Sequence, residues 1–432
     1  MIDPVEQVVG ELVGELDARF PYAAALLSGA SGIQISDNGS EQDATETNPS
    51  RGIVFTVYDG AAFQEYATSD LDAARLASGA RAWAGGLSPR TGGPPISGVD
   101  REVGPAPERL TFATQMEVDP ASVPLSEKLR LMRDIQRRAR DLDARIVQAQ
   151  ARYADQTQHC VYIGRGRWLV QDVTRAVFAI IIAVSDGTQV RYHYTINGKT
   201  AGFEVTRIGE EELRQTADTA LRLLEAERIE PGEYTIVTDS SISGTIAHES
   251  FGHGVELDLF PKGRALSKKY LDRQVAAPMI QMYDDPSYTG GYGSYFFDDE
   301  GEVARPTQIL KDGVFVLPIS DFAAATYAPG THTPNGRRQD FTRKAYARMT
   351  NTFFGSGDAP PEELIAGVAR GVYLRSAESG MEDPMGWGIQ VTAHYGEEIV
   401  DGRPTGRLFA PIGITGYVPD VLRSIDAVGS DF

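Results

Sequence analysis

The chain has 432 residues, 41% of them hydrophobic and 23% charged, a composition typical of folded globular proteins that excludes wholesale disorder. This length exceeds that of one ordinary domain and predicts two. The formal net charge is -19, so the surface repels phosphate backbones and anionic headgroups, which argues against nucleic acid or a membrane surface as a partner.

The N-terminal segment MIDPVEQVVGELVGELDARF lacks a basic region and an uninterrupted apolar stretch, so it does not predict a signal peptide. The longest apolar run, AVFAIIIAV at 176–184, is shorter than the roughly 18 residues that a membrane helix needs. The single cysteine, Cys160, has no partner for an internal disulfide. We therefore expect a cytoplasmic protein, and a packed thiol at Cys160 rather than a nucleophile.

The first hundred residues predict helices around short hairpins. Residues 5–29 place apolar side chains at spacings of three and four, which predicts an amphipathic helix. Segments 33–41 and 51–68 alternate in polarity and break at Asn-Gly and Asp-Gly, a pair typical of hairpin turns. Ser69 is expected to cap the next helix. Residues 85–110 are rich in Gly and Pro and predict a long surface loop or linker. A plain connection between elements is the favoured role of this loop, and gating of substrate is the alternative.

The middle of the chain predicts a long helix and an antiparallel sheet. Apolar residues recur every three or four positions over 124–153, which indicates one helix that packs on the sheet or forms a subunit contact. Strand-like segments follow at 168–173, 176–196 and 202–206, with an Asp-Gly turn in the second. Residues 210–227 predict another helix.

Residues Glu230, Pro231 and Gly232 mark the predicted domain boundary. The fold class is then α+β in two domains: an N-terminal sheet-and-helix domain over 1–229 and a C-terminal β-rich domain over 230–432. In the second domain we expect many short strands, a helix that carries a His-Glu motif, and one further helix at 360–371.

The segment GTIAHESFGHGVELD contains the strongest chemical pattern, with His248, Glu249 and His253 on one predicted helix. Neutral imidazoles bind Zn²⁺, and a glutamate beside them can take a proton from an attacking water molecule. In the usual His-Glu-x-x-His pattern the histidines are four residues apart and share a helix face. Here they are five apart, about 140° around a regular helix, so both can bind one metal only if the helix widens by one residue. Gly252 and Gly254 would make that distortion easier.

A surface helix that carries two histidines by chance is the alternative, but only six histidines occur in the chain. The apolar strand YTIVT ends at Asp239, and a turn of small residues leads directly into the motif. Glu256 and Asp258 follow closely, where one of them could orient an imidazole or simply add polarity to the helix. This context favours a metal site.

Four segments, the first of which contains the His-Glu motif, resemble a known family: PGEYTIVTDSSISGTIAHESFGHGVELD, GSYFFDDEGEVARPTQILKDGVF, THTPNGRRQDFTRKAYARMTNTFF and IDAVGSDF. Together with a weaker match at SRGIVFTVYDGAAFQEYATSDL they make the chain similar to the TldD/PmbA metallopeptidases over nearly its whole length. The resemblance implies a zinc peptidase for unfolded or short peptides or precursor leaders. It also implies an enclosed cavity, substrate bound as an added strand, and a TldD-like subunit that pairs with a TldE/PmbA-like partner or with its own copy.

The resemblance assigns the first two zinc ligands to His248 and His253 and the catalytic base to Glu249. It leaves cavity-wall, peptide-terminus or structural roles open for the following motif residues: Asp298, Asp299, Glu300, Arg337 and Arg338.

The third zinc ligand of the family is a cysteine in a Gly-x-Cys-Gly segment shortly after the stretch that here ends at Phe432. No residue of this sequence matches that position, and Cys160 matches no family ligand. We expect His248 and His253 to face a common point without a cysteine, and His394 and Glu256 are the side chains to inspect beside them.

These observations predict a zinc-dependent peptidase. The alternative is a non-hydrolytic binding or regulatory subunit of a TldD/TldE-type complex with an incomplete metal site, which retention of Glu249 argues against. A modulator of DNA topology, as older family naming suggests, conflicts with the charge of -19.

Overall fold

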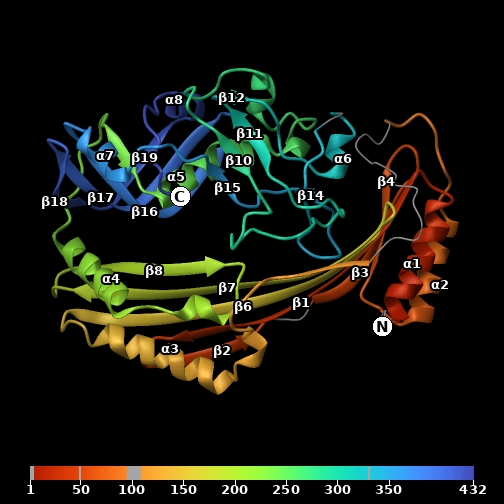
Figure 1. The fold of residues 1–432 in the computed structure, drawn as a ribbon, viewed down its shortest axis with the longest axis horizontal. Helices are drawn as coiled ribbons and strands as arrows, with labels where there is room; N and C mark the ends of the chain where they lie inside the picture. The colour runs from red at the N-terminus through yellow and green to blue at the C-terminus, as the bar shows by residue number, and fades with distance from the viewer. Residues whose placement is uncertain (1–3, 48–49, 95–108, 329–330) are drawn as a thin grey trace.

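The computed structural model describes residues 4–47, 50–94, 109–328 and 331–432. The chain folds as the α+β protein that the sequence predicts. Its N-terminal half forms an eight-stranded sheet in the order β4-β3-β1-β6-β7-β5, with β2 added to β1 and β8 added to β7. The β-rich C-terminal half lies over one face of this sheet (Figure 1).

The N-terminal half contains these elements in chain order: α1 (Pro4–Asp17), β1 (Tyr22–Asp37), β2 (Gln42–Glu46), β3 (Ser50–Tyr58), β4 (Phe63–Thr68), α2 (Ala73–Gly85), β5 (Arg109–Ala113), α3 (Leu125–Arg140), β6 (Ile146–Gly164), β7 (Arg167–Ser185), β8 (Val190–Lys199) and α4 (Glu210–Arg222). Short 3-10 helices lie between some of them: Pro120–Ser122, Phe203–Thr206 and Leu223–Glu225.

The C-terminal half contains a five-stranded sheet in the order β18-β17-β16-β9, with β19 paired to β17, and a four-stranded sheet in the order β12-β11-β10-β15. Its elements are β9 (Ile236–Thr238), α5 (Ser240–Ala247), β10 (Met282–Asp284), β11 (Thr307–Lys311), β12 (Val314–Phe315), α6 (Phe322–Ala325), β13 (Gly336–Arg337), β14 (Tyr346–Ala347), β15 (Thr352–Phe354), α7 (Pro361–Ala366), β16 (Arg370–Asp383), β17 (Gly388–Val400), β18 (Arg403–Phe409), β19 (Ile412–Tyr417) and α8 (Val418–Arg423).

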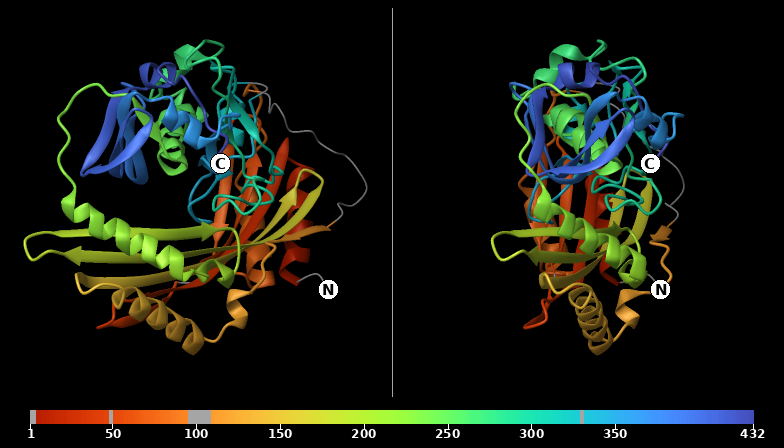
Figure 2. Two further views of the ribbon diagram at one scale, coloured as in Figure 1. Left: turned by 60° about the vertical axis from the view of Figure 1, so that its left-hand side comes forward. Right: turned by 90° about the vertical axis from the view of Figure 1, so that its left-hand side faces the viewer.

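Different parts of the chain pack on the two faces of the large sheet, as the alternating side chains of β1 show. Ala25, Leu27 and Ile35 point toward the helices, where α1 and α2 form one apolar core and α3 and α4 form another. Leu26, on the opposite face, packs with Phe297 and other residues of the C-terminal half. Helices thus cover one face, and the C-terminal half lies on the other (Figure 2).

The three hairpin turns that the sequence predicts are present. Asn38-Gly39 joins β1 to β2, Asp59-Gly60 joins β3 to β4, and Asp186-Gly187 joins β7 to β8. The glycines have φ values of 89°, 98° and 91°, in the left-handed region that disfavours other residues.

The helix predicted over 5–29 is wrong in its second half. It ends at Asp17, and Tyr22–Asp37 form strand β1, which pairs with β3 and β6 in the middle of the sheet. Because a central strand is apolar on both faces, its side chains also satisfied the helical spacing. The predicted cap is also wrong, since Asp72 and not Ser69 accepts the hydrogen bond, from the backbone N–H of Arg75, at the start of α2.

The helix predicted over 124–153 is likewise too long, because it ends at Arg140 and β6 begins at Ile146. A β-bulge between Ile146 and Gln148 lets Ile146 and Ala149, three positions apart in the sequence, be buried on the same face of the sheet. That bulge imitates a helical period within a strand. The predicted strand at 202–206 is instead a 3-10 helix, Phe203–Thr206, whereas the predicted helix at 210–227 is confirmed as α4 and the short turn after it.

Residues 95–108 of the predicted loop at 85–110 lie outside the described residues. In the ranges that are described, no helix has the length and apolar character needed to cross a membrane.

Candidate metal and catalytic site

The His-Glu segment is anchored by the aspartate that precedes it. Asp239 follows β9 and caps α5, accepting a hydrogen bond of 2.9 Å from the backbone N–H of Ile242. Its second carboxylate oxygen accepts one of 2.8 Å from the backbone N–H of Ser376, on strand β16. One side chain therefore fixes the start of the helix and joins it to the neighbouring strand.

The helix widens where the spacing of the histidines requires it. Residues His248–Gly252 form a π-helical turn, in which the backbone N–H of His253 donates to the carbonyl of His248, five residues earlier. The two imidazole rings lie with centroids 4.9 Å apart and planes at 90°. The predicted distortion is therefore present, and it brings two potential metal ligands side by side.

Close packing, and not conformational freedom, explains the two glycines of this segment. Gly252 has an ordinary φ of -81°, but a Cβ there would lie 2.0 Å from Sδ of Met349. A Cβ at Gly254 would lie 2.7 Å from Oε1 of Glu382 and 3.0 Å from Nε1 of Trp387. The sequence suggested that these glycines ease the distortion of the helix. The structure shows instead that neither position has room for a side chain.

The two histidines have different electrostatic surroundings. Burial lowers the pKa of His248, and the positive charge of His253 adds to this effect. The pKa of His253 is raised by Glu256, whose Oε1 lies 3.6 Å from Nδ1, while Arg348 binds the other carboxylate oxygen at 3.1 Å. A metal binds only neutral imidazole, so a metal ion at this ring would compete with the protonation that Glu256 favours, and Glu256 is placed to orient the ring.

Strand β16 supplies the opposite wall of the site. Gly380 lies directly against Glu249, since a Cβ there would be 2.5 Å from Cγ of that glutamate. Two positions further along the strand is Glu382, whose carboxylate oxygens are buried and have no hydrogen-bond partner among the described residues. Burial, followed by the charges of Glu249 and Glu256, raises the pKa of Glu382 to about 9. The side chain is thus protonated at neutral pH and adds no charge beside the candidate base.

Sequence reasoning missed Gly380 and Glu382, because nothing local distinguishes them from other residues of a hairpin. Their position follows from tertiary packing of β16 against the π-helical turn.

Other candidates from the sequence lie elsewhere. His394 donates a 2.6 Å hydrogen bond from Nε2 to the carbonyl of Tyr192, and its ring stacks on His193. Asp258 pairs with Lys262 at 2.8 Å and so does not orient an imidazole. Cys160 is a buried thiol of β6, and burial raises its pKa. Across the part of the chain that the structure describes, no cluster of three or more His, Cys, Asp or Glu side chains has the arrangement of a metal site.

The two remaining motifs, Asp298 to Glu300 and Arg337 with Arg338, meet in one buried network. Asp298 accepts a 2.9 Å hydrogen bond from the backbone N–H of Gly336, and Asp299 accepts one of 2.7 Å from that of Arg338. Glu300 accepts one of 2.6 Å from the backbone N–H of Phe322.

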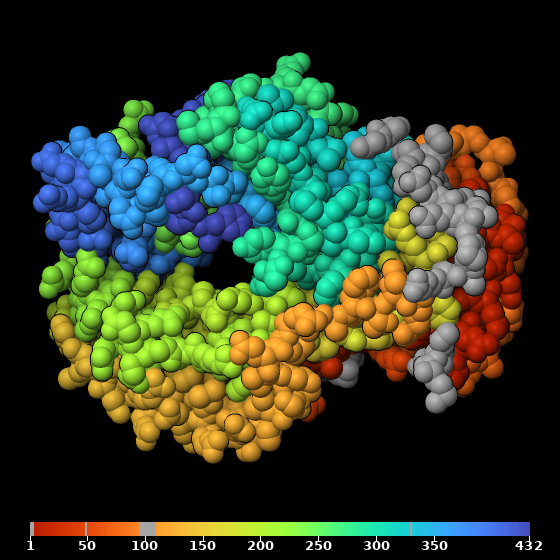
Figure 3. Space-filling model, viewed as in Figure 1, coloured from red at the N-terminus to blue at the C-terminus, as the bar shows by residue number. Residues whose placement is uncertain are grey.

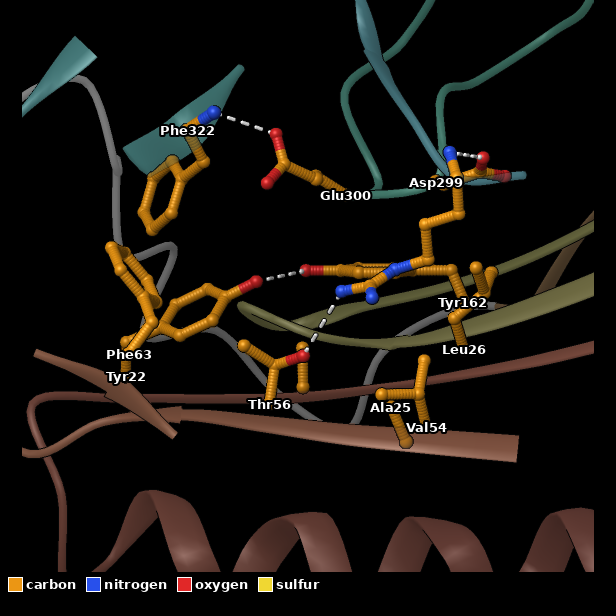
Figure 4. Close-up of a pocket in the computed structure, with 12 residues that line it drawn as sticks. Tyr22, Ala25, Leu26, Val54, Thr56, Phe63, Tyr162, Asp299, Glu300 and Phe322 are labelled. Atoms are coloured by element: carbon orange, nitrogen blue, oxygen red, sulfur yellow. Dashed lines mark hydrogen bonds between the residues drawn. The ribbon is translucent and has the colours of Figure 1, made fainter. Parts of the chain in front are cut away.

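The network also connects the two halves of the chain. The guanidinium of Arg338 binds Glu65 of β4 and reaches Thr56 of β3. Thr56, Asp299 and Glu300 line a small cavity of about 20 Å³ at this contact between the halves (Figure 4). Buried carboxylates that accept hydrogen bonds from backbone N–H groups have a structural role. The ion pair between Arg338 and Glu65 likewise stabilises the packing of one half of the chain on the other. These motifs therefore hold the two halves together, and the structure places no reactive group of the His-Glu segment in their network.

Comparison with known proteins gives a consistent picture. Residues 231–432 match the PmbA/TldA metallopeptidase C-terminal domain, and residues 118–226 match the central domain of the same group. A protein of Methanothermobacter thermautotrophicus named a metalloprotease is 32% identical over 72% of this chain and 68% of its own length. A metalloprotease of Methanocaldococcus jannaschii is 27% identical over 73% and 69%.

Solved structures share the fold at low sequence identity. A putative modulator of a DNA gyrase from Thermotoga maritima superposes with a TM-score of 0.79 at 18% identity, covering 99% of this chain and 95% of its own. TldE from Thermococcus kodakarensis superposes with a TM-score of 0.71 at 16% identity, over 98% and 94%.

Proposed function

Because the chain belongs to the TldD/PmbA family of metallopeptidases, we propose that it is a zinc-dependent peptidase with its active centre on the π-helical turn. His248 and His253 hold the metal, and Glu249 is the general base. The observation that carries the proposal is the turn itself, which sets two imidazoles 4.9 Å apart with a glutamate between them in sequence. A relative in Saccharolobus solfataricus is named a zinc metalloprotease, which supports the choice of metal.

The two imidazoles fit zinc in donor type, and a third protein ligand is not provided by the residues described. Bound zinc would polarise the scissile carbonyl and acidify a water molecule. Glu249 accepts the proton from the attacking water and delivers it to the departing amine. Gly380 keeps the space that this side chain occupies, and Glu256 orients His253.

We propose unfolded or short peptides, or precursor leaders, as the substrates, bound in a cavity beside the π-helical turn. The Thermotoga maritima structure is titled a putative modulator of a DNA gyrase, but the net charge of -19 on this chain opposes binding to DNA. Binding of duplex DNA that weakens steeply with salt would contradict this choice.

Substitution of the base tests the proposal. Glu249→Gln should abolish hydrolysis of a labelled unfolded polypeptide while the zinc content per chain stays nearly unchanged, since Glu249 is not a ligand. His253→Ala should lower both. Equal hydrolysis by the Glu249→Gln variant and the wild type would remove Glu249 from the mechanism, and unchanged zinc in His253→Ala would remove the ligand assignment.

We also propose that the working form is an oligomer of at least two chains, either with a TldE/PmbA-like partner or with a second copy. The fold shared with TldE supports this assembly. Light scattering of the purified protein, alone and with a partner of that type, should show a mass of two or more chains. An active monodisperse monomer would contradict it.

A further inference from the structure

The face of the large sheet opposite the helices is only partly covered. On β1, Leu26 packs under the C-terminal half, whereas Gln34 and Ser36 of the same face line a cavity of about 660 Å³. The space-filling view shows a hollow between the C-terminal half and strand β8 (Figure 3). A volume of this size fits several side chains of a bound ligand.

Strands β7 and β8 contribute an apolar part of the cavity lining, called the floor below, whereas β1, β2 and β6 contribute mainly polar side chains. Val177, Ala179 and Ile181 of β7 lie beside Ile196 and Tyr194 of β8, and all five line the cavity. Alternate residues of β7 are buried under α3 and α4, so this strand is apolar on both faces although only one is covered by helices. Ile196 is 61% exposed. An uncovered apolar surface of this kind is typical of a binding site.

Two sets of hydrogen bonds, called supports below, connect the large sheet to the C-terminal half on either side of the floor. At one, the hydroxyl of Tyr192 donates to Glu378 at 2.8 Å and that of Tyr194 donates to the carbonyl of Ala377 at 2.6 Å. Residue 377 lies three positions before Gly380, which contacts the candidate base Glu249. This support therefore leads directly to one wall of the active centre.

The second support leads to the other wall. Arg175 of β7 donates hydrogen bonds of 2.8 Å to the carbonyls of Tyr292 and Ser294. The segment that contains them is bound by Asn351, which accepts from the backbone N–H of Gly293 at 2.9 Å. Two residues before Asn351, Met349 packs on Gly252 of the π-helical turn. The floor lies between these supports, and both continue into the His-Glu segment.

We infer that this floor is the specificity surface of the peptidase and that it selects extended peptide segments with apolar side chains next to the bond to be cleaved. The inference rests on the proposed function for the position of that bond. Continuity with the candidate active centre through both supports favours a peptide over a second copy of the chain as the occupant. An extended peptide presents alternate side chains to one surface at a spacing that matches the strands below it.

Binding of two fluorescein-labelled decapeptides of equal length and charge tests the inference, with the Glu249→Gln chain used so that nothing is cleaved. One peptide carries Leu and Phe at alternate positions, and the other carries Ser and Asn. We expect the apolar peptide to bind at least tenfold more tightly by fluorescence anisotropy. Equal affinities would overturn the inference.

Substitutions on β8 locate the effect. Ile196→Asn, at a position exposed enough to leave folding intact, should weaken binding of the apolar peptide about threefold to tenfold and leave the polar peptide unchanged. Val190→Asn is the matched control, because Val190 is 59% exposed on the same strand but does not line the cavity. No effect of Ile196→Asn, or an equal effect of Val190→Asn, would refute the assignment.

Two further outcomes distinguish a failure of this inference from a failure of the proposed function. If Ile196→Asn changes the mass by light scattering and not the binding of peptide, the floor is a contact between chains and the inference is wrong. If the wild type prefers the apolar peptide but never cleaves it in the presence of zinc, the proposed function fails while the binding preference stands.

Discussion

Substitution of Gly380 by alanine probes the contact between β16 and the candidate base without touching a polar group. The new methyl group would lie 2.5 Å from Cγ and 2.6 Å from Oε1 of Glu249. Carbon atoms in contact are normally about 3.5 to 4.0 Å apart, so the glutamate has to withdraw by about 1 Å. Displacement of a reacting group by that distance reduces the rate about a hundredfold, or about 2.7 kcal/mol in the activation barrier.

The expected result for Gly380→Ala is therefore a kcat for peptide hydrolysis about a hundredfold below that of the wild type, with zinc content per chain unchanged. Gly388→Ala on the neighbouring strand β17 is the control, because no atom of the described residues lies within 4 Å of a Cβ at that glycine. It should retain the wild-type kcat. Wild-type activity in Gly380→Ala, or equal losses in both variants, would show that Glu249 does not need this space.

Two further predictions concern stability and are measured by urea unfolding. Arg338→Ala should lower the free energy of unfolding by about 3 to 5 kcal/mol, because it leaves the carboxylate of Glu65 without its positively charged partner between the two halves. A loss within about 0.5 kcal/mol, as expected for the exposed Arg75→Ala, would contradict a structural role for this ion pair. Burial lowers the pKa of His193 to about 3, below the ordinary value of about 6.5. Below pH 6.5 the unfolded chain binds a proton at this position and the folded chain does not, so the free energy of unfolding decreases as the pH falls from 6.5 toward 3. At pH 5 the loss relative to pH 8 is about 2 kcal/mol, and His193→Phe should lack this part of the pH dependence; the same pH dependence in wild type and variant would contradict it.

The sequence predicted the parts of the fold that depend on neighbouring residues. Hairpin turns such as Asn38-Gly39 were correct because the turn conformation itself demands these residue types. Helices were extended too far where a strand happened to repeat the helical spacing, as the bulge after Ile146 does in β6. Amino-acid spacing alone does not distinguish a bulged strand from a helix, because the difference lies in which partner strand receives the hydrogen bonds.

The same distinction applies to the site. Pairing of His248 with His253 was predictable, because an interval of five residues in a helical segment leaves a π-helical turn as the simplest way to align them. The contact of Glu249 with Gly380 was not, since it depends on how a strand far along the chain packs against that turn.

The π-helical turn also explains the order of residues within the motif. In a regular helix the residue four positions after His248 would lie nearest to it on the same face, and in this chain that residue is Gly252. Gly252 instead packs against Met349, where no side chain fits, and the inserted residue moves His253 beside the ring of His248. The glycine and the wider turn therefore depend on each other: a side chain at 252 would push Met349 away, and a regular turn would leave His248 without a second imidazole. The spacing of five residues therefore fits both the close packing at Gly252 and the pairing of the two imidazoles.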